Sequence, residues 1–209
     1  MKLSYLALGD SYTIGEGLPF DENFPSQTVA LLNQSVATDP VQQIQIALPK
    51  VIAKTGWTTD ELNDAIDETN LNETFDIVSL LIGVNNQYRG RTVDEYKDEF
   101  ESLLRRAIGF AGNRANHVFV LSIPDWGVTA FADGKDRYEI AVAIDAYNDA
   151  ARMICNRHEI IFIDNTVSQR MDGTQPKFLV ADKLHPSKLE YAKWAIKLAA
   201  AIKYTIENE

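Results

Sequence analysis

Ser11, Asp182 and His185 are the residue types that nucleophilic catalysis by a hydroxyl group requires. Ser11 lies in the stretch Gly9 to Gly17, which holds three glycines in nine residues, and Asp182 lies three residues before His185. A serine hydroxyl is a weak nucleophile until a neighbouring base takes its proton. An aspartate can hold one imidazole nitrogen and leave the other free for the serine. The three side chains would together support acyl transfer, although Asp-x-x-His alone is more often a helix cap or a surface pair.

The positions of the other two histidines indicate that His185 is the base. His117 begins a predicted strand, and His158 ends a predicted helix, where its positive form would interact favourably with the helix dipole. Neither position is at the carboxyl end of a strand, where open α/β sheets bind their ligands. His185 is therefore the remaining candidate.

Two further residues could stabilise an oxyanion. Asn85, in the stretch Gly83-Val84-Asn85-Asn86, supplies a side-chain amide donor, and Gly56 supplies an N–H that no side chain obstructs. With the N–H of Ser11 they could surround the negative charge that develops in acyl transfer. The plain alternative for residues 83–86 is a turn, since Asn and Gly are common turn formers.

Apolar runs predict the elements that would position these residues. The expected strands are 3–8, 43–47, 75–82, 117–123 and 160–163. Helices are expected at 27–33, 60–69, 93–110 and 138–157, and a last one capped by Ser187 has an inner stripe of Leu189, Ala192, Ile196, Ala199 and Ile202. Alternating strands and helices predict an α/β fold with one parallel sheet between two helical layers. By analogy with other folds of this size, we expect the strand order 2-1-3-4-5.

This topology brings the candidate residues together. Ser11, Gly56 and Asn85 each follow a predicted strand, and His185 follows the fifth strand and its loop. The carboxyl ends of parallel strands lie at one edge of the sheet, so four loops that are distant in sequence converge on one crevice. A merely structural role is reasonable for each of these four stretches by itself. It is improbable that all four have only such a role, because they lie at matching ends of the strands.

Composition limits the class of protein. The 209 residues are 45% hydrophobic and carry a formal net charge of −10, which argues against nucleic acid or an anionic membrane as a partner. The single cysteine, Cys155, excludes an internal disulfide, and no apolar run is long enough to span a membrane. The run that begins at Leu3 breaks at Asp10 and is shorter than a typical signal-peptide core, so we expect a cytoplasmic protein unless an upstream signal has been removed.

The motifs resemble those of the SGNH hydrolases, the GDSL family of esterases and lipases. The matching blocks, in the family's order, are Gly9-Asp10-Ser11, Gly56, Gly83-Val84-Asn85-Asn86 and Asp182-Lys183-Leu184-His185. The resemblance implies one flavodoxin-like three-layer domain over 1–209 with a five-stranded sheet, and an esterase that needs no metal or cofactor. It also implies a triad of Ser11, Asp182 and His185 and an oxyanion hole of Ser11, Gly56 and Asn85.

The chain departs from the family pattern at two positions. Tyr12 replaces the usual leucine after the serine, and Asn86 replaces the usual aspartate of the third block. The asparagine of the oxyanion hole is retained. The substitution at Asn86 therefore bears on how that asparagine is oriented, and not on the mechanism.

The sequence says less about the substrate than about the catalytic residues. Trp57 and Trp126 flank the expected site and either line a substrate pocket or pack the loops. Because no lid segment is visible, we expect a preference for acetyl to butyryl esters. Acetylated sugars, lipid esters and thioesters all remain candidate substrates, and transfer of the acyl group to an alcohol is the nearest alternative reaction. A non-catalytic domain that binds phosphate at Gly9–Gly17 is the alternative from another class. The sequence does not indicate the oligomeric state.

Overall fold

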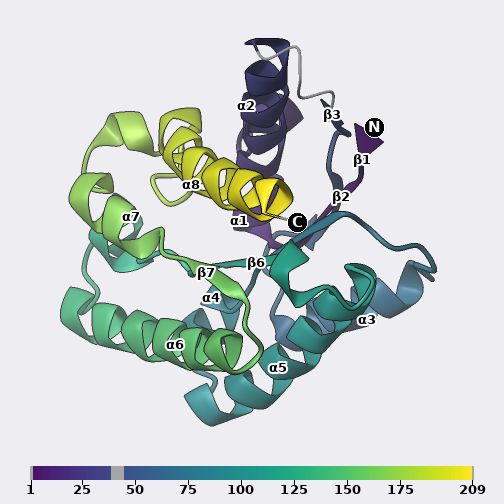
Figure 1. Cartoon of the computed structure of the whole chain (residues 1–209). Helices are drawn as coiled ribbons and strands as arrows, with labels where there is room; N and C mark the ends of the chain where they lie inside the picture. Colours follow the sequence, from purple (N-terminus) through teal and green to yellow (C-terminus); the bar gives the residue numbers. More distant parts are fainter. Residues whose placement is uncertain (1, 39–44, 209) are drawn as a thin grey trace.

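A five-stranded parallel sheet forms the centre of the fold in the computed structural model, which describes residues 2–38 and 45–208 (Figure 1). The strand order is β4-β2-β5-β6-β7, with bounds Lys50–Lys54, Tyr5–Asp10, Ile77–Leu81, Val118–Leu121 and Ile161–Ile163. Numbered along the chain, this order is 2-1-3-4-5, as predicted. Every residue of β2, β5 and β6 is buried, as expected for central strands covered on both faces.

Helices cover both faces of this sheet and make the three layers that the sequence predicts (Figure 1). Helices α2 (Phe24–Thr38) and α8 (Lys188–Glu207) pack against each other on one face. Helices α3 (Thr59–Glu68), α5 (Val93–Phe110) and α6 (Arg137–Arg157) cover the other. Helix α5 has the predicted bounds because Thr92 and Glu95 form a capping box at its start. The remaining α-helices, α1 (Ser11–Ile14), α4 (Val84–Tyr88) and α7 (Thr166–Asp172), are short.

The second strand of the main sheet was predicted at the wrong place. The strand β3 (Gln45–Ile46) does form within the predicted range 43–47, but it pairs with β1 (Lys2–Leu3) in a separate two-stranded sheet. Residues 43 and 44 lie outside the described residues. The second strand is β4, an edge strand with an exposed lysine at each end. Such an edge strand lacks the continuous apolar run on which the prediction relied, and its lysines discourage pairing with another chain.

The buried face of α8 also differs from the predicted stripe. Leu189 and Ile196 are 47% and 58% exposed, whereas Tyr191 and Trp194 are fully buried. Both rings pack on Phe24 of α2, with ring centroids 6.2 and 6.1 Å apart. Burying two large aromatic rings outweighs burying Leu189 and Ile196, because the favourable free energy scales with the apolar area removed from water. The helix is rotated accordingly, and only the carboxyl-terminal part of the predicted stripe, Ala199 and Ile202, is buried.

Candidate active site

Ser11 lies where β2 ends and α1 begins. Asp10 is the N-cap of α1 and accepts a hydrogen bond of 3.0 Å from the N–H of Tyr12. Gly9 is needed because a Cβ atom there would collide with the carbonyl oxygen of Leu81 on β5 and with the Thr13 side chain. Ser11 is only 4% exposed, because the imidazole of His185 lies against the hydroxyl group.

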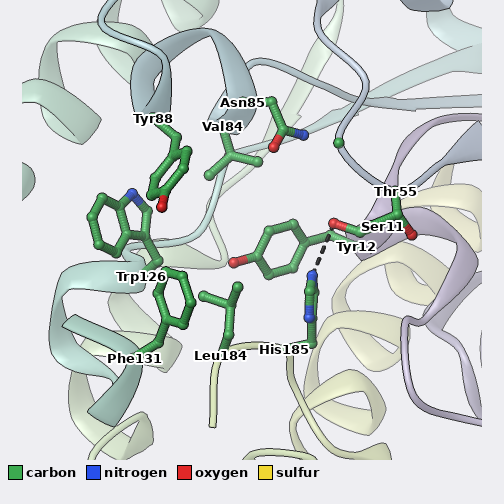
Figure 2. A pocket seen from close by; sticks show the side chains of 11 residues that line it. Ser11, Tyr12, Thr55, Val84, Asn85, Tyr88, Trp126, Phe131, Leu184 and His185 are labelled. Carbon is green, nitrogen blue, oxygen red and sulfur yellow. Dashed lines mark hydrogen bonds between the residues drawn. The ribbon is translucent and has the colours of Figure 1, made fainter. Parts of the chain in front are cut away.

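Ser11, His185 and Asp182 form a continuous hydrogen-bonded chain (Figure 2). The distance from Ser11 Oγ to His185 Nε2 is 2.9 Å, and that from His185 Nδ1 to Asp182 Oδ2 is 2.6 Å. A tight turn places the last two residues, since the N–H groups of Leu184 and His185 donate to Asp182 Oδ1 at 2.8 and 3.0 Å. The Tyr12 ring packs against the imidazole ring of His185, with ring centroids 5.0 Å apart. This geometry allows a proton to pass from the hydroxyl to the imidazole.

The carboxyl group of Asp182 is held in its charged form. Its partial burial would by itself raise the pKa, but hydrogen bonds from the His185 ring and from two backbone N–H groups outweigh burial and lower the pKa below its usual value. A carboxylate beside Nδ1 keeps the proton on that nitrogen, which leaves Nε2 able to accept one.

Asn85 and Gly56 lie at the same edge of the sheet as Ser11. Asn85 is on the one-turn helix α4 after β5, and Gly56 follows β4 with a φ of +86°, a conformation that favours glycine. Both residues and Ser11 line one hollow, and the amide nitrogen of Asn85 is turned to the side where Ser11 lies (Figure 2). The structure therefore brings together all five residues expected in the triad and the oxyanion hole.

Residues of the helix α4 and the residue after it form hydrogen bonds with the loop that follows β4 and with the first residue of α3. Asn85 Nδ2 donates to the carbonyl of Trp57 at 2.9 Å, and Asn86 Oδ1 accepts from the N–H of Thr59 at 3.1 Å. Arg89 Nη2 donates to the carbonyl of Gly56 at 2.7 Å. We call Asn85, Asn86 and Arg89 the α4 clamp. Sequence reasoning missed Arg89, although its spacing of four residues from Asn85 places both on one face of a helix.

An acidic neighbour of Asn86 explains why this position carries an amide and not a carboxyl group. Its Nδ2 donates to Thr59 Oγ1 at 2.6 Å and to Glu99 Oε2 at 3.3 Å, and Thr59 Oγ1 donates to the same carboxylate oxygen. An aspartate at this position could only accept when ionised. The amide can donate, and Glu99 of α5 supplies the carboxylate. The residue that departs from the expected pattern is therefore fully hydrogen-bonded and 0% exposed.

The hollow beside Ser11 has a volume of about 160 Å³ and an apolar wall. The side of the hollow farthest from Ser11 is formed by three aromatic rings, those of Tyr88, Trp126 and Phe131 (Figure 2). Tyr88 and Phe131 each meet Trp126 edge to face, at centroid distances of 5.3 and 6.0 Å. Trp57 does not line the hollow, and its side chain packs against the core. The sequence indicated Trp126 but not Tyr88.

Asp10 makes folding stability depend on pH. It is fully buried and its Oδ2 has no hydrogen-bond partner within the part of the chain that the structure describes, so burial raises its pKa to about 7. Between about pH 4 and 7 the folded chain holds a proton that the unfolded chain has lost, so the free energy of unfolding falls as pH rises, by up to about 4 kcal/mol. We expect Asp10→Asn to remove this dependence, so that the variant gains stability relative to the wild type between pH 4 and pH 8.

Urea unfolding of both proteins at several pH values measures this effect. The variant Asp21→Asn, at an exposed carboxyl group, is the control and should follow the wild type. Parallel stability curves for wild type and Asp10→Asn would contradict a raised pKa at Asp10.

Within residues 2–38 and 45–208, no group of three or more His, Cys, Asp or Glu side chains could hold a metal ion. In the same ranges no helix is both long and apolar enough to cross a membrane. The absence of a cofactor stays a prediction.

The chain is similar to known proteins in both its sequence and its fold. The model of the GDSL-like lipase/acylhydrolase family matches residues 7–193. The acetylxylan esterase Axe2 from Geobacillus stearothermophilus has a TM-score of 0.72 at 18% identity, over 96% of this chain and 94% of that chain. The lipase/acylhydrolase from Enterococcus faecalis has a TM-score of 0.69 at 22% identity, over 97% and 96%. The psychrotrophic esterase EstA from Pseudoalteromonas sp. has a TM-score of 0.70 at 14% identity, over 98% of each chain. No curated protein matches the sequence.

Proposed function

The chain belongs to the GDSL-like lipase/acylhydrolase family, and we propose that it is a serine esterase that cleaves esters of short carboxylic acids through an acyl-enzyme on Ser11. The observation that carries this proposal is the hydrogen-bonded chain from Ser11 Oγ through His185 to Asp182. Membership of the family makes the protein an SGNH-type hydrolase that acts on esters. The roles of individual residues and the acyl-chain preference are the proposal.

In the first half of the reaction, Ser11 Oγ attacks the ester carbonyl carbon while His185 Nε2 takes the hydroxyl proton. The tetrahedral intermediate collapses when the imidazolium donates that proton to the alkoxy oxygen, and the C–O bond to the alcohol breaks. Asp182 stabilises the imidazolium and does not itself take the proton. Water then attacks the acyl-enzyme with His185 again as base, which releases the acid and restores Ser11.

The negative charge on the former carbonyl oxygen needs donors that are already in place. We assign this role to the N–H groups of Ser11 and Gly56 and to Asn85 Nδ2. Donors held by the protein are not reorganised during the reaction, which makes them far more effective than water. The α4 clamp supports this assignment, because it fixes the Gly56 loop to the helix that carries Asn85.

The hollow predicts the acyl-chain preference. Its volume of about 160 Å³ is below the roughly 300–1,000 Å³ of pockets for drug-sized ligands. We expect kcat/KM to be highest for acetyl to butyryl esters and to fall beyond about six carbons, because further methylenes find no apolar surface. Initial rates with p-nitrophenyl esters from acetate to palmitate measure the preference. A maximum at decanoate or longer would refute it.

Three further measurements separate the alternatives. Faster cleavage of acyl thioesters than of matched oxygen esters would indicate a thioesterase, and acylation of an added alcohol in preference to water would indicate a transferase. Tight binding of a mononucleotide with no ester turnover would indicate a non-catalytic phosphate-binding domain.

A further inference from the structure

Trp126 lies between two hollows of the protein. It lines the hollow beside Ser11, at the end formed by the aromatic rings (Figure 2). It also lines a larger groove of about 610 Å³. The apolar part of that groove comes from α5 and α6 and consists of Val93, Ile140, Ala143 and Tyr147. A single side chain therefore takes part in the walls of both spaces.

The Trp126 ring is held in place from several directions. Its Nε1 donates to Gln87 Oε1 at 2.8 Å, and its backbone carbonyl accepts from Thr129 Oγ1 at 2.7 Å. Lys135 covers the ring, with Nζ 5.8 Å from its centroid. The residue is only 4% exposed. A ring fixed in this way is a wall, and not a lid that a substrate could push aside.

The acyl chain is the part of an ester that would meet this wall. Once the carbonyl carbon is bonded to Ser11, the leaving alcohol must lie near His185 Nε2, which gives it a proton. The apolar hollow extends from Ser11 to the three rings, with Val84 and Leu184 on its sides. An acyl chain that enters the hollow is therefore directed at Trp126.

We infer that Trp126 sets the acyl-chain length that the enzyme accepts, by separating the acyl pocket from the groove between α5 and α6. The inference rests on the proposed function and names the residue that determines its specificity. In the wild type the chain ends at the indole ring. Without the ring the two spaces join, and the groove becomes a binding site for the distal methylenes of a medium-length acyl chain.

Trp126→Ala tests this, with Tyr88→Ala as the matched control. Tyr88 is an aromatic residue of the same wall that lines the hollow beside Ser11 but does not line the groove. The quantity to compare is the ratio of kcat/KM for p-nitrophenyl decanoate to that for the butanoate, below the concentration at which decanoate forms micelles. This ratio does not depend on the fraction of folded enzyme. If Trp126→Ala does not fold, Trp126→Leu takes its place in the experiment, because it also shortens the wall.

The decanoate-to-butanoate ratio should rise on the order of 100-fold in Trp126→Ala, since each newly buried methylene contributes roughly fourfold and about half of the extra methylenes of decanoate would enter the groove. It should change less than about fivefold in Tyr88→Ala. An unchanged ratio in Trp126→Ala and Trp126→Leu, or an equal rise in Tyr88→Ala, would overturn the role of Trp126. Wild-type enzyme without activity on any of these esters would instead refute the proposed function.

Discussion

Ser11→Ala is expected to lower kcat/KM for p-nitrophenyl acetate by more than about 10³-fold, because the substitution removes the hydroxyl group on which the proposed acyl-enzyme forms. The fold should be retained. The substitution removes one hydrogen bond to His185, worth about 1 kcal/mol, so the melting temperature should shift by a few degrees at most. Turnover of the chromogenic ester and thermal unfolding of the same preparation measure both quantities.

Ser26→Ala is the matched control for this experiment. Ser26 is another buried serine, and its hydroxyl has no hydrogen-bond partner among the described residues. Its removal should leave esterase activity unchanged. A p-nitrophenyl phosphonate, which labels activated serines, should modify the wild type and Ser26→Ala but not Ser11→Ala. If Ser11→Ala keeps more than a few per cent of the activity, Ser11 is not the nucleophile.

Asn85→Ala is expected to lower kcat by about 10²–10³ and to leave KM nearly unchanged. The amide would donate to an oxygen whose charge develops only in the transition state, so its loss raises the barrier without weakening substrate binding. Michaelis–Menten kinetics on p-nitrophenyl acetate separate the two parameters. A change confined to KM would assign Asn85 to substrate binding.

Asn85 also holds the Trp57 carbonyl, so the effect on the loop must be separated from the loss of the donor. Arg89→Met removes a different bond of the α4 clamp, the one to Gly56, and leaves the amide of Asn85 in place. We expect it to lower kcat by about tenfold or less, since a loosened donor is still present. Equal losses in the two variants would mean that Asn85 acts only through the clamp.

Local patterns explain which parts of the fold could be predicted. The central strands are apolar on both faces, so each is a continuous run in the sequence. The edge strand β4 has exposed lysines at both ends and no such run. On α8 the helical period allows more than one apolar stripe. The stripe that is buried was decided by Phe24 of α2, a residue more than 150 positions away.

The candidate site also divides into residues that the sequence predicts and residues that it does not. Its central residues lie in short motifs at strand ends, and the parallel topology requires these to meet. The supporting contacts join residues that no motif connects, such as Asn86 with Glu99 and Arg89 with Gly56. Tyr88 also belongs to no motif, and only the packing of α4 against the Trp126 loop makes it part of the pocket.

The α4 clamp has a mechanical consequence that follows from the strand order. Strand β2, which ends one residue before Ser11, lies between β4 and β5. The clamp joins the helix after β5 to the segment after β4, so it forms a bridge across the end of the middle strand. These two segments cannot separate unless the four hydrogen bonds from the clamp to Gly56, Trp57 and Thr59, each worth about 1 kcal/mol, break together. The span between two of the proposed oxyanion donors, the Gly56 N–H and Asn85 Nδ2, is therefore set before any ester arrives.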